Sequence, residues 1–424
     1  MSGKIVNNVF RASGVIAATP GGLDWSTAVV NGSTLTATAG KGYFINTTSN
    51  ACTVTLPSSA EIGDQIVFAD YARTWSTNNL IIDSNGNNFQ GDPDTYTVDY
   101  STAGQSLNIV YSDATKGWLP VSDDAVAFDH GDPLTQRAIF AYGDTGSVTN
   151  ISNLVNSSGV VAADVTGVGT ARAGLAAATY GGDKAIFGYG SGYSNLSNLV
   201  TNVGVVGTDV TGVGTARDFL AATSYGGDKA IFGYGNIYSG GYVIYSLKNL
   251  VSNSGVVATD VSGVGTARRE LSATTYGGDK GMFAYGNSGG STMVSLKNLI
   301  SNTGVVAADV SGVGTARNLL AASYYGEDKA IFAYGQSSGG NTNVSNLVTN
   351  LGVIGADVSG VGTSRRGVAA ASYGGDKGVF AFGYTDANVS LKNLVNNSGV
   401  IAADVSGVGT ARVNLAAAGY SYST

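Results

Sequence analysis

The chain has 424 residues, enough for two or three domains, and only 12% of them are charged. The net charge of −7 argues against nucleic acid as a partner, because nucleic-acid-binding proteins present basic surfaces. No segment approaches the roughly 20 consecutive apolar residues of a membrane span, and the single cysteine, Cys52, excludes an intramolecular disulfide framework. The opening MSGKIVNNVFRASG lacks a charged n-region followed by an apolar stretch, so we expect no secretory signal.

The N-terminal part predicts a short arm followed by a small β domain. Residues 1–23 are polar, with scattered glycines and a Pro-Gly-Gly stop, and we interpret them as an extended arm or docking segment. Residues 24–122 contain strand-length runs such as GYFINTT, CTVTLP and DQIVFADY between turn residues, which predicts a small antiparallel β-sandwich or jelly roll. The run DSNGNNFQGDPDT has calcium-binding residue types, but it lacks EF-hand spacing, which favours an Asx-rich turn.

Two stretches of this β domain, GKGYFINTTSNACTVTLPSSAEIGDQIVFADY and LNIVYSDATKGWLPV, carry a resemblance to known proteins. They resemble the small β modules in the N-terminal halves of bacteriophage tail-fibre proteins. The likeness covers about a quarter of the chain, and no motif in it is as diagnostic as a set of metal ligands.

A change of composition separates this part from the rest of the chain. Residues 1–136 hold 5 Lys or Arg against 13 Asp or Glu, whereas residues 137–424 are nearly balanced with 17 against 16. All Trp and Pro residues also lie before residue 137. The boundary falls in DDAVAFDHGDPLTQ, and we predict a linker over residues 123–136.

The remainder is built from six copies of one unit, anchored by the motif GVGT[AS]R. We refer to its last residues as the GTAR arginines: Arg172, Arg217, Arg268, Arg317, Arg365 and Arg412. They recur at intervals of 45, 51, 49, 48 and 47 residues, a period typical of propeller blades. Each unit predicts four strands, of the types LAAATY, KAIFGYG, NLV and VVAADVSGV.

The ends of this region predict a closed assembly of six blades over residues 137–424. The chain enters at a second strand, RAIFAYG, and finishes on a first strand, VNLAAAGYSYST, so the last strand can complete the first blade. In KAIFGYG we expect Ala185, Phe187 and Tyr189 to share one face, while Ile186 and Gly188 share the other. Large side chains of one blade would then fill the small face of the next.

The order of signals in each unit resembles the kelch repeat family. A blade-closing arginine is followed by a small-residue strand, an aliphatic-aromatic strand ending in Gly, and a short strand with a turn. The resemblance implies a six-bladed β-propeller. The region departs from the kelch pattern because F-[AG]-Y-G replaces the paired glycines and no Trp is present, so we carry over no kelch partner.

The repeats differ from one another at two places, which an up-and-down blade puts on one face. These are the inserts after the KAIF-type strand and the junctions after the GTAR arginines. A constant scaffold with one variable face suits binding, although drift of exposed loops explains the variation equally well. The candidate binding residues are Tyr238, Tyr242 and Tyr245 in the longest insert, together with Phe219 and Arg269 at junctions.

Residues repeated in every copy favour a structural role over chemistry. An Asp that precedes each GTAR arginine and an Asp before most KAIF lysines predict turn caps or charge pairs rather than a ring of ligand sites. The only histidine, His130, falls in the linker, which excludes a Ser-His-Asp triad within the repeats. We predict no catalytic residues, no metal site and no cofactor.

The near-identical cassettes NLVSNSGVVATDVSGVGTAR and YGGDKAIFGYG resemble repeats in fibre and other virion proteins of bacteriophages, notably those that infect cyanobacteria. The resemblance implies a non-enzymatic virion protein, a tail fibre or receptor-binding protein assembled in the host cytoplasm. Its partners would be other virion proteins and a host surface glycan or protein, with a homotrimer as one oligomeric state although no heptads are visible. The alternatives are a capsid-bound head fibre or decoration protein, a glycan-cleaving propeller enzyme, and a cellular adhesin or lectin.

Overall fold

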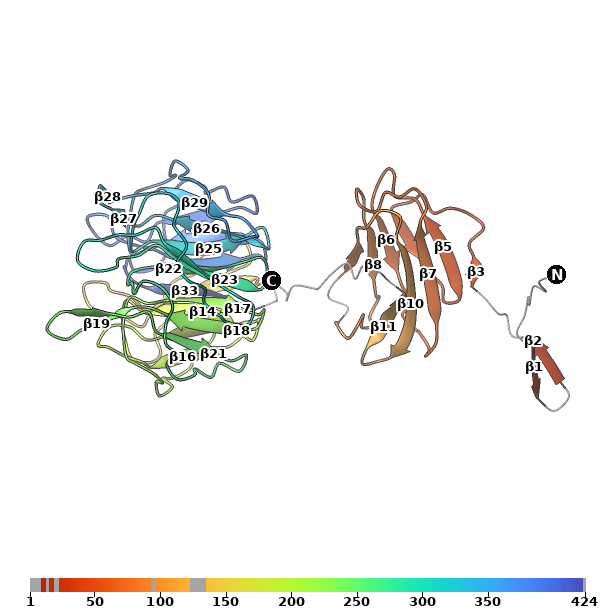
Figure 1. The fold of residues 1–424 in the computed structure, drawn as a ribbon, viewed down its shortest axis with the longest axis horizontal. Helices are drawn as coiled ribbons and strands as arrows, with labels where there is room; N and C mark the ends of the chain where they lie inside the picture. Colours follow the sequence, from red (N-terminus) through yellow and green to blue (C-terminus); the bar gives the residue numbers. More distant parts are fainter. Residues whose placement is uncertain (1–8, 13–14, 19–22, 94–96, 123–134, 422–424) are drawn as a thin grey trace. The chain divides into compact units, whose positions relative to one another are not determined.

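The computed structural model describes residues 9–12, 15–18, 23–93, 97–122 and 135–421 (Figure 1). Every regular element among them is a β-strand, so the predicted all-β class is confirmed for this part of the chain. None of the described residues forms a helix that is long and apolar enough to cross a membrane. The chain divides into two compact units, Met1–His130 and Gly131–Thr424, which are described separately below.

The first unit begins with a two-stranded antiparallel hairpin in the region predicted as an arm. Strand β1 (Val9–Ala12) pairs with β2 (Val15–Ala18). The rest of the unit comprises two sheets. The five-stranded sheet has the order β11-β10-β7-β5-β3, and the four-stranded sheet has the order β4-β6-β8-β9. Their strands are β3 (Asp24–Trp25), β4 (Thr34–Thr36), β5 (Lys41–Ile45), β6 (Cys52–Thr55), β7 (Gln65–Asp70), β8 (Leu80–Asp83), β9 (Val98–Tyr100), β10 (Ser106–Asp113) and β11 (Gly117–Ser122).

The pairing within these sheets corrects the prediction of an antiparallel arrangement. From β3 to β8 the chain alternates between the two sheets, and the pairs β3–β5, β5–β7, β4–β6 and β6–β8 are all parallel. Each of the strands β4 to β7 therefore lies in the crossover between two parallel strands of the other sheet. The pairs β8–β9, β7–β10 and β10–β11 are antiparallel, and a short turn joins β10 to β11 as a hairpin. Strand-length runs do not reveal which sheet each run joins, so the sequence left this undecided.

One hydrophobic core lies between the two sheets of the first unit. It includes Trp75 and Trp118, which are fully buried, and side chains from both sheets such as Ile66 and Leu80. Cys52 is also fully buried there, and burial raises the pKa of its thiol. The Asx-rich run acts as a turn where it is described: Asn85 donates from its backbone to Asp83 and from its side chain to the Leu56 carbonyl. Residues 94 and 95 of that run lie outside the described residues.

The second unit contains six three-stranded antiparallel sheets, which we number by the chain order of their middle strands. They are sheet I, with β33 (Ala416–Tyr420), β12 (Arg137–Ala141) and β13 (Ser152–Val155); sheet II, with β14 (Ala176–Tyr180), β15 (Lys184–Gly188) and β16 (Ser197–Val200); and sheet III, with β17 (Ala221–Tyr225), β18 (Lys229–Gly233) and β21 (Lys248–Val251). Then follow sheet IV, with β22 (Ser272–Tyr276), β23 (Lys280–Ala284) and β24 (Lys297–Ile300); sheet V, with β25 (Ala321–Tyr325), β26 (Lys329–Ala333) and β29 (Ser345–Val348); and sheet VI, with β30 (Ala369–Tyr373), β31 (Lys377–Ala381) and β32 (Lys392–Val395).

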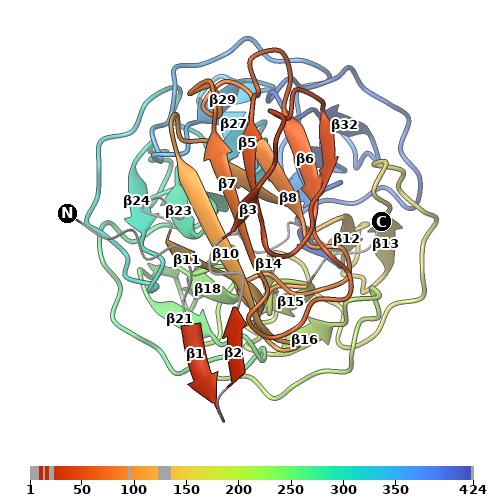
Figure 2. The same ribbon diagram turned by 90° about the vertical axis from the view of Figure 1, so that its right-hand side faces the viewer.

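The first strands of these sheets are neighbours in chain order, and Figure 2 shows the sheets arranged around a common centre. Contacts join β14 to β17, β17 to β22, β22 to β25 and β25 to β30, and then return through β33 to β14. The last strand, β33, pairs with β12 from Arg137–Tyr420 to Ala141–Ala416, which is the pairing that the ends of the repeats predicted. Alanine, serine and threonine fill these first strands because six of them crowd around the centre.

The alternation expected in the KAIF-type strand holds up to its last residue and then breaks. Ala185 and Phe187 pack towards sheet I, whereas Ile186 packs towards sheet III, as predicted. Tyr189 was expected beside Phe187 but instead joins Ile186 against sheet III. The reason is its φ of 66°, a left-handed conformation that ends the strand and reverses the direction of the side chain. The equivalent residue has a positive φ in all six copies.

The predicted fourth strand is also incorrect as a regular strand. In each copy this segment makes only two isolated bridges to the third strand, for example Val155 with Val161 and Ser152 with Val165. Between them the Asn153 side chain donates to the Ala162 carbonyl at 3.0 Å, so a side chain replaces a ladder hydrogen bond. Glycine and Asp in VVAADVSGV suit such an irregular edge better than a paired strand.

Adjacent sheets interlock as the residue sizes predicted. A Cβ added to Gly188 would lie 2.7 Å from the Phe232 ring of the next sheet, so the ring occupies the place of the missing side chain. The Tyr189 ring packs against Phe232 as well, with ring centroids 5.2 Å apart. Contacts of this type recur between neighbouring sheets, and Phe382 with Phe140 supplies the one between sheets VI and I.

Candidate functional site

The connections between strands define two faces of the second unit. We call the face with the tight YGGDK-type turns between first and second strands the turn face. The insert face carries the inserts after the KAIF-type strands, which are 144–152, 191–197, 236–248, 287–297, 336–345 and 384–392, and the junction residues after the GTAR arginines. Junction and insert meet through backbone bridges, as between Asp218 and Asn236.

The GTAR arginines join each sheet to the next one. Each is fully buried beside the aromatic ring that ends its neighbour's KAIF-type strand, and Arg217 lies 4.5 Å from the centre of the Tyr189 ring. Its guanidinium donates to Asn249 Oδ1 at 2.7 Å and to the carbonyls of Tyr234 and Thr215. Arg412 makes the same bonds to the first copy, where it donates to Asn153 Oδ1 at 2.7 Å.

The repeated Asp completes this contact and explains why it recurs. Asp209 accepts hydrogen bonds from the backbone and hydroxyl of Thr170 and from Asn198, and it lies 3.6 Å from Arg172. Burial raises the pKa of Asp209, but the hydrogen bonds from Thr170 and Asn198 outweigh it and hold the pKa below its usual value. The predicted charge pairing of these residues is present, and it connects adjacent sheets.

The turn face is closed by backbone hydrogen bonds that pass from copy to copy. Gly181 donates to the Asp228 carbonyl at 2.6 Å, and equivalent bonds link the following copies. The series ends with Gly374 donating to Gln136 and Ser421 donating to Asp183. Residue 136 thus takes the place of the repeated Asp. The last two residues of the predicted linker, 135 and 136, therefore pack with the repeats, while residues 123–134 lie outside the described residues.

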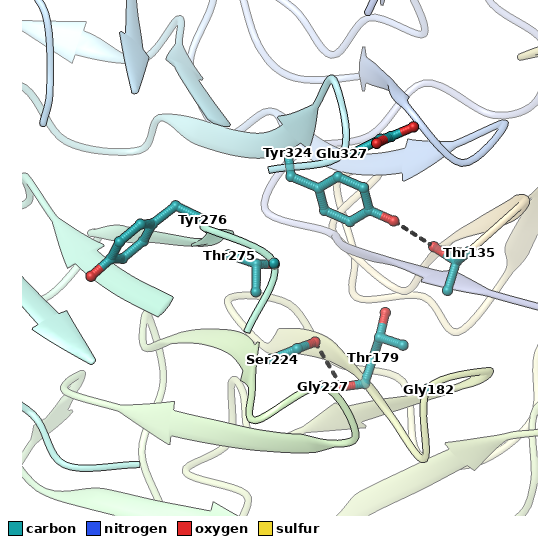
Figure 3. Close-up of a pocket in the computed structure, with 10 residues that line it drawn as sticks. Thr135, Thr179, Gly182, Ser224, Gly227, Thr275, Tyr276, Tyr324 and Glu327 are labelled. Atoms are coloured by element: carbon teal, nitrogen blue, oxygen red, sulfur yellow. Dashed lines mark hydrogen bonds between the residues drawn. The ribbon is translucent and has the colours of Figure 1, made fainter. Parts of the chain in front are cut away.

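A small pocket opens where the first strands end at the turn face (Figure 3). Hydroxyl groups line it, and Thr135 bonds to the Tyr324 hydroxyl at 3.1 Å. The Ser224 hydroxyl donates to the Thr179 carbonyl at 2.8 Å. Burial raises the pKa of Tyr324 above the ordinary value of a tyrosine. These hydroxyls bond to a neighbouring strand and to Thr135, which ties the first strands together at this end.

The insert face has its own series of backbone hydrogen bonds, which we call the junction belt. It consists of the second residue after each GTAR arginine: Gly174, Phe219, Glu270, Leu319, Gly367 and Asn414. The N–H of each donates to the carbonyl of the preceding one at 2.7 to 3.0 Å, and Gly174 donates to Asn414, which completes the series. All six have φ between 49° and 61°, a conformation that favours glycine.

The structure brings three of the five predicted binding residues together. Tyr238 and Tyr242 face one another across a hairpin of β19 (Asn236–Tyr238) and β20 (Tyr242–Ile244), with ring centroids 5.3 Å apart. They are 55% and 59% exposed, and Arg269 lies 3.7 Å from the centre of the Tyr242 ring. Figure 1 shows β19 on the left side of the second unit, the same side as the shorter hairpin of β27 (Gln336–Ser337) and β28 (Gly340–Asn341).

The other two predicted residues occupy different positions. Phe219 is a half-buried member of the junction belt, and its ring lies over Gly174, 3.5 Å from where a Cβ would be. Tyr245 lies after the hairpin and is half-buried, with its N–H donating to the Gly235 carbonyl at 2.8 Å. Tyr245 therefore supports the base of the insert rather than its exposed tip.

Sequence reasoning missed a polar cluster beside these aromatic rings. It comprises Asp218, Arg269, Glu270 and Asn318, contributed by three consecutive junctions. Glu270 accepts a hydrogen bond from Asn318 Nδ2 and lies 3.7 Å from Arg269 Nε. Burial raises the pKa of Asp218 to about 6, against the opposing charge of Arg269. The signal in the sequence was the concentration of charged residues at two adjacent junctions, DF and RE.

Among the described residues, no three His, Cys, Asp or Glu side chains gather closely enough to hold a metal ion. No protein-family model matches the chain, and no curated protein shows significant sequence similarity to it. The candidate site is therefore defined by its own geometry: an insert face with exposed tyrosines, a buried polar cluster and a belt of left-handed residues.

Proposed function

We propose that the second unit is a six-bladed, kelch-like β-propeller and the first a small β-sandwich. Three features support the propeller. Contacts between first strands return to the starting sheet, β33 pairs with β12, and Arg412 donates a hydrogen bond to Asn153 of the first copy. In such a propeller the chain's last strand completes the first blade. A single core between two sheets supports the sandwich.

Deletion of residues 413–424 tests the closure of this propeller. The deletion removes β33, so β12 loses one paired neighbour, and β30 and β14 lose the first strand that packs between them. We expect the domain to lose cooperative thermal unfolding, measured by circular dichroism and calorimetry. Sharp unfolding near the wild-type temperature would contradict a propeller that depends on this strand.

We propose further that the protein is a non-enzymatic bacteriophage virion protein, a tail fibre or receptor-binding protein whose insert face binds the host. The single observation that carries the binding role is the division of the repeats. The hydrogen bonds of the GTAR arginines are nearly the same in all copies, whereas the junctions and inserts differ and present exposed Tyr238 and Tyr242. Constant frames with variable loops suit recognition. The virion assignment rests on the resemblance of both regions to phage fibre modules.

Residues 1–122 would attach the protein to the particle. An exposed aromatic pair offers a docking surface on the five-stranded sheet: Trp25 and Phe44 stack with centroids 4.6 Å apart and are 39% and 38% exposed. Half-exposed aromatic rings of this kind commonly anchor protein interfaces. The chain enters the second unit through Thr135 at the turn face, which leaves the insert face free of that connection.

Adsorption to host cells tests the binding face. One variant replaces Asn236–Lys248 by the shorter insert Ser191–Ser197, and a second replaces Lys184, Lys229 and Lys329 on the turn face by Ala. We expect the first to lose adsorption and the second to keep it. Loss in the lysine variant alone, with both proteins folded, would place binding on the turn face instead.

Particle assembly tests the attachment role. Trp25→Ala and a chain of residues 130–424 should incorporate poorly into virions compared with wild type, measured by immunoblotting of purified particles. Incorporation of the shortened chain at wild-type levels would contradict the assignment. Gold-labelled antibody on intact particles separates tail from capsid, and release of soluble sugar from host polysaccharide would favour an enzyme.

A further inference from the structure

The insert face departs from six-fold repetition in one sector. Within the junction belt the bulky residues Phe219, Glu270 and Leu319 occupy consecutive copies, while glycine occupies two of the other three positions. The three longest inserts, 236–248, 287–297 and 336–345, belong to the same consecutive copies. Two independent features of the repeats therefore change together on one side of the face.

Three belt residues of this sector carry a side chain in a backbone conformation that favours glycine. Phe219, Glu270 and Leu319 have φ of 49°, 56° and 50°. Side chains with a Cβ are disfavoured in this conformation, and the same belt accommodates glycine at Gly174 and Gly367. Strained residues of this kind concentrate at ligand sites, because a functional side chain justifies the unfavourable conformation.

The side chains of the sector combine exposed rings with buried polar groups. Arg269 is held between the Tyr242 ring at 3.7 Å and the Glu270 carboxylate at 3.7 Å, which orders both. Asp218 Oδ1, Asn318 Oδ1 and Arg269 Nε have no hydrogen-bond partner within the described residues. Unpartnered polar atoms beside exposed rings are hydrogen-bonding groups that a ligand could satisfy.

We propose that this sector binds one neutral pyranose ring of an oligosaccharide, an inference that rests on the proposed host-binding function. The apolar face of the sugar stacks on Tyr238 or Tyr242, and its hydroxyls bond to the Glu270 carboxylate. Two carboxylates, Asp218 and Glu270, face one guanidinium, Arg269, so the site repels acidic sugars. A pre-ordered Tyr242 loses little side-chain freedom on binding, which favours recognition of a small ligand.

Saturation-transfer NMR on the full chain tests the proposal with methyl glycosides of glucose, galactose, mannose and N-acetylglucosamine, and with glucuronate as the acidic comparator. We expect transfer to at least one neutral glycoside and none to glucuronate. Tyr242→Ala and Phe219→Gly should each raise its Kd at least tenfold. Phe219→Gly should leave the melting temperature unchanged or higher, because glycine relieves the strain, so lost binding is not lost folding.

Two matched variants outside the three copies of this sector serve as controls. Asn414→Gly changes the same belt position, and Tyr384→Ala removes the ring that lies 4.7 Å from Arg366, a similar Arg–Tyr pair. Both should bind as wild type does. Absence of transfer to every neutral glycoside, preference for glucuronate, binding that survives Phe219→Gly, or equal loss in Asn414→Gly would each overturn the proposal. Virion labelling tests the proposed function separately, so the two failures are distinguishable.

Discussion

Arg268 and Arg269 are adjacent in the chain but belong to two different regions of the repeats. Arg268 is fully buried and donates to Asn298. It belongs to the contacts of the GTAR arginines, which link one sheet to the next in nearly the same way in every copy and which we call the frame. Arg269 lies on the insert face, where the equivalent residues are Ala173, Asp218, Asn318, Arg366 and Val413. The frame repeats because each sheet must dock on the next, whereas the insert face is free to differ. Each copy is therefore an internal control for the others.

The largest difference between the two regions should appear when each arginine is removed. Arg268→Ala leaves Asn298 and the Tyr234 ring without their buried partner, and we expect a loss of about 3 kcal/mol in the free energy of unfolding. Arg269→Ala removes a contact with a largely exposed ring and should cost about 1 kcal/mol or less. Guanidinium unfolding measures both. Equal losses would mean that Arg269 is part of the frame.

Two neighbouring glycines extend the comparison to the backbone. Gly190 ends a KAIF-type strand with φ of 116°, and an added Cβ would lie 3.0 Å from the Ala173 carbonyl oxygen. Gly192 lies in the insert with φ of 76° and open space around it. We expect Gly190→Ala to destabilise by about 2 kcal/mol and Gly192→Ala by about 1 kcal/mol. The reverse order, in the same unfolding assay, would contradict the distinction.

The pH dependence of stability tests the junction at Asp218, whose counterpart in another copy is Asn318. The pKa of Asp218 is about 6 when folded, above the ordinary value of 3.8, so the folded state keeps a proton that the unfolded chain releases. Stability from this group is present at low pH and falls as pH rises from about 4 to 6. Asp218→Asn should abolish that fall and stabilise the protein at pH 7 by about 1 to 2 kcal/mol. Unfolding curves across that range that do not differ from wild type would refute a buried Asp218.

The smallest effects are expected on the turn face. Lys184, Lys229 and Lys329 each contact the preceding Asp at 2.6 to 2.9 Å, but these lysines are more than two-fifths exposed. Water and salt weaken such pairs, so each Lys→Ala change should alter stability by less than about 0.5 kcal/mol. Differential scanning fluorimetry at low and high salt provides the measurement. A marked, salt-dependent loss would show that these pairs hold the face together.

Local sequence determined much of the repeat architecture. Spacing and residue size predicted the strands β14 and β15, the nesting of Phe232 against Gly188, and the pairing of β33 with β12. These features depend on alternation and on the order of elements, both of which a single chain displays. The structural role of the repeated Asp and Arg followed from their presence in every copy. Exposure of Tyr238 and Tyr242 followed from their place in the longest insert.

Only the tertiary structure decided features that depend on which segments meet. Strand-length runs did not reveal that β5 and β7 pair in parallel, because the strand between them joins the other sheet. The left-handed conformation of Tyr189 was not predicted either. Aromatic residues rarely adopt a positive φ, and here the packing of neighbouring sheets imposes it. The cluster of Asp218, Glu270 and Asn318 unites residues from three copies, about 50 positions apart in the chain, so the charged residues at the junctions did not by themselves show that they meet. Their proximity arises because consecutive sheets place equivalent junctions side by side in one hydrogen-bonded belt.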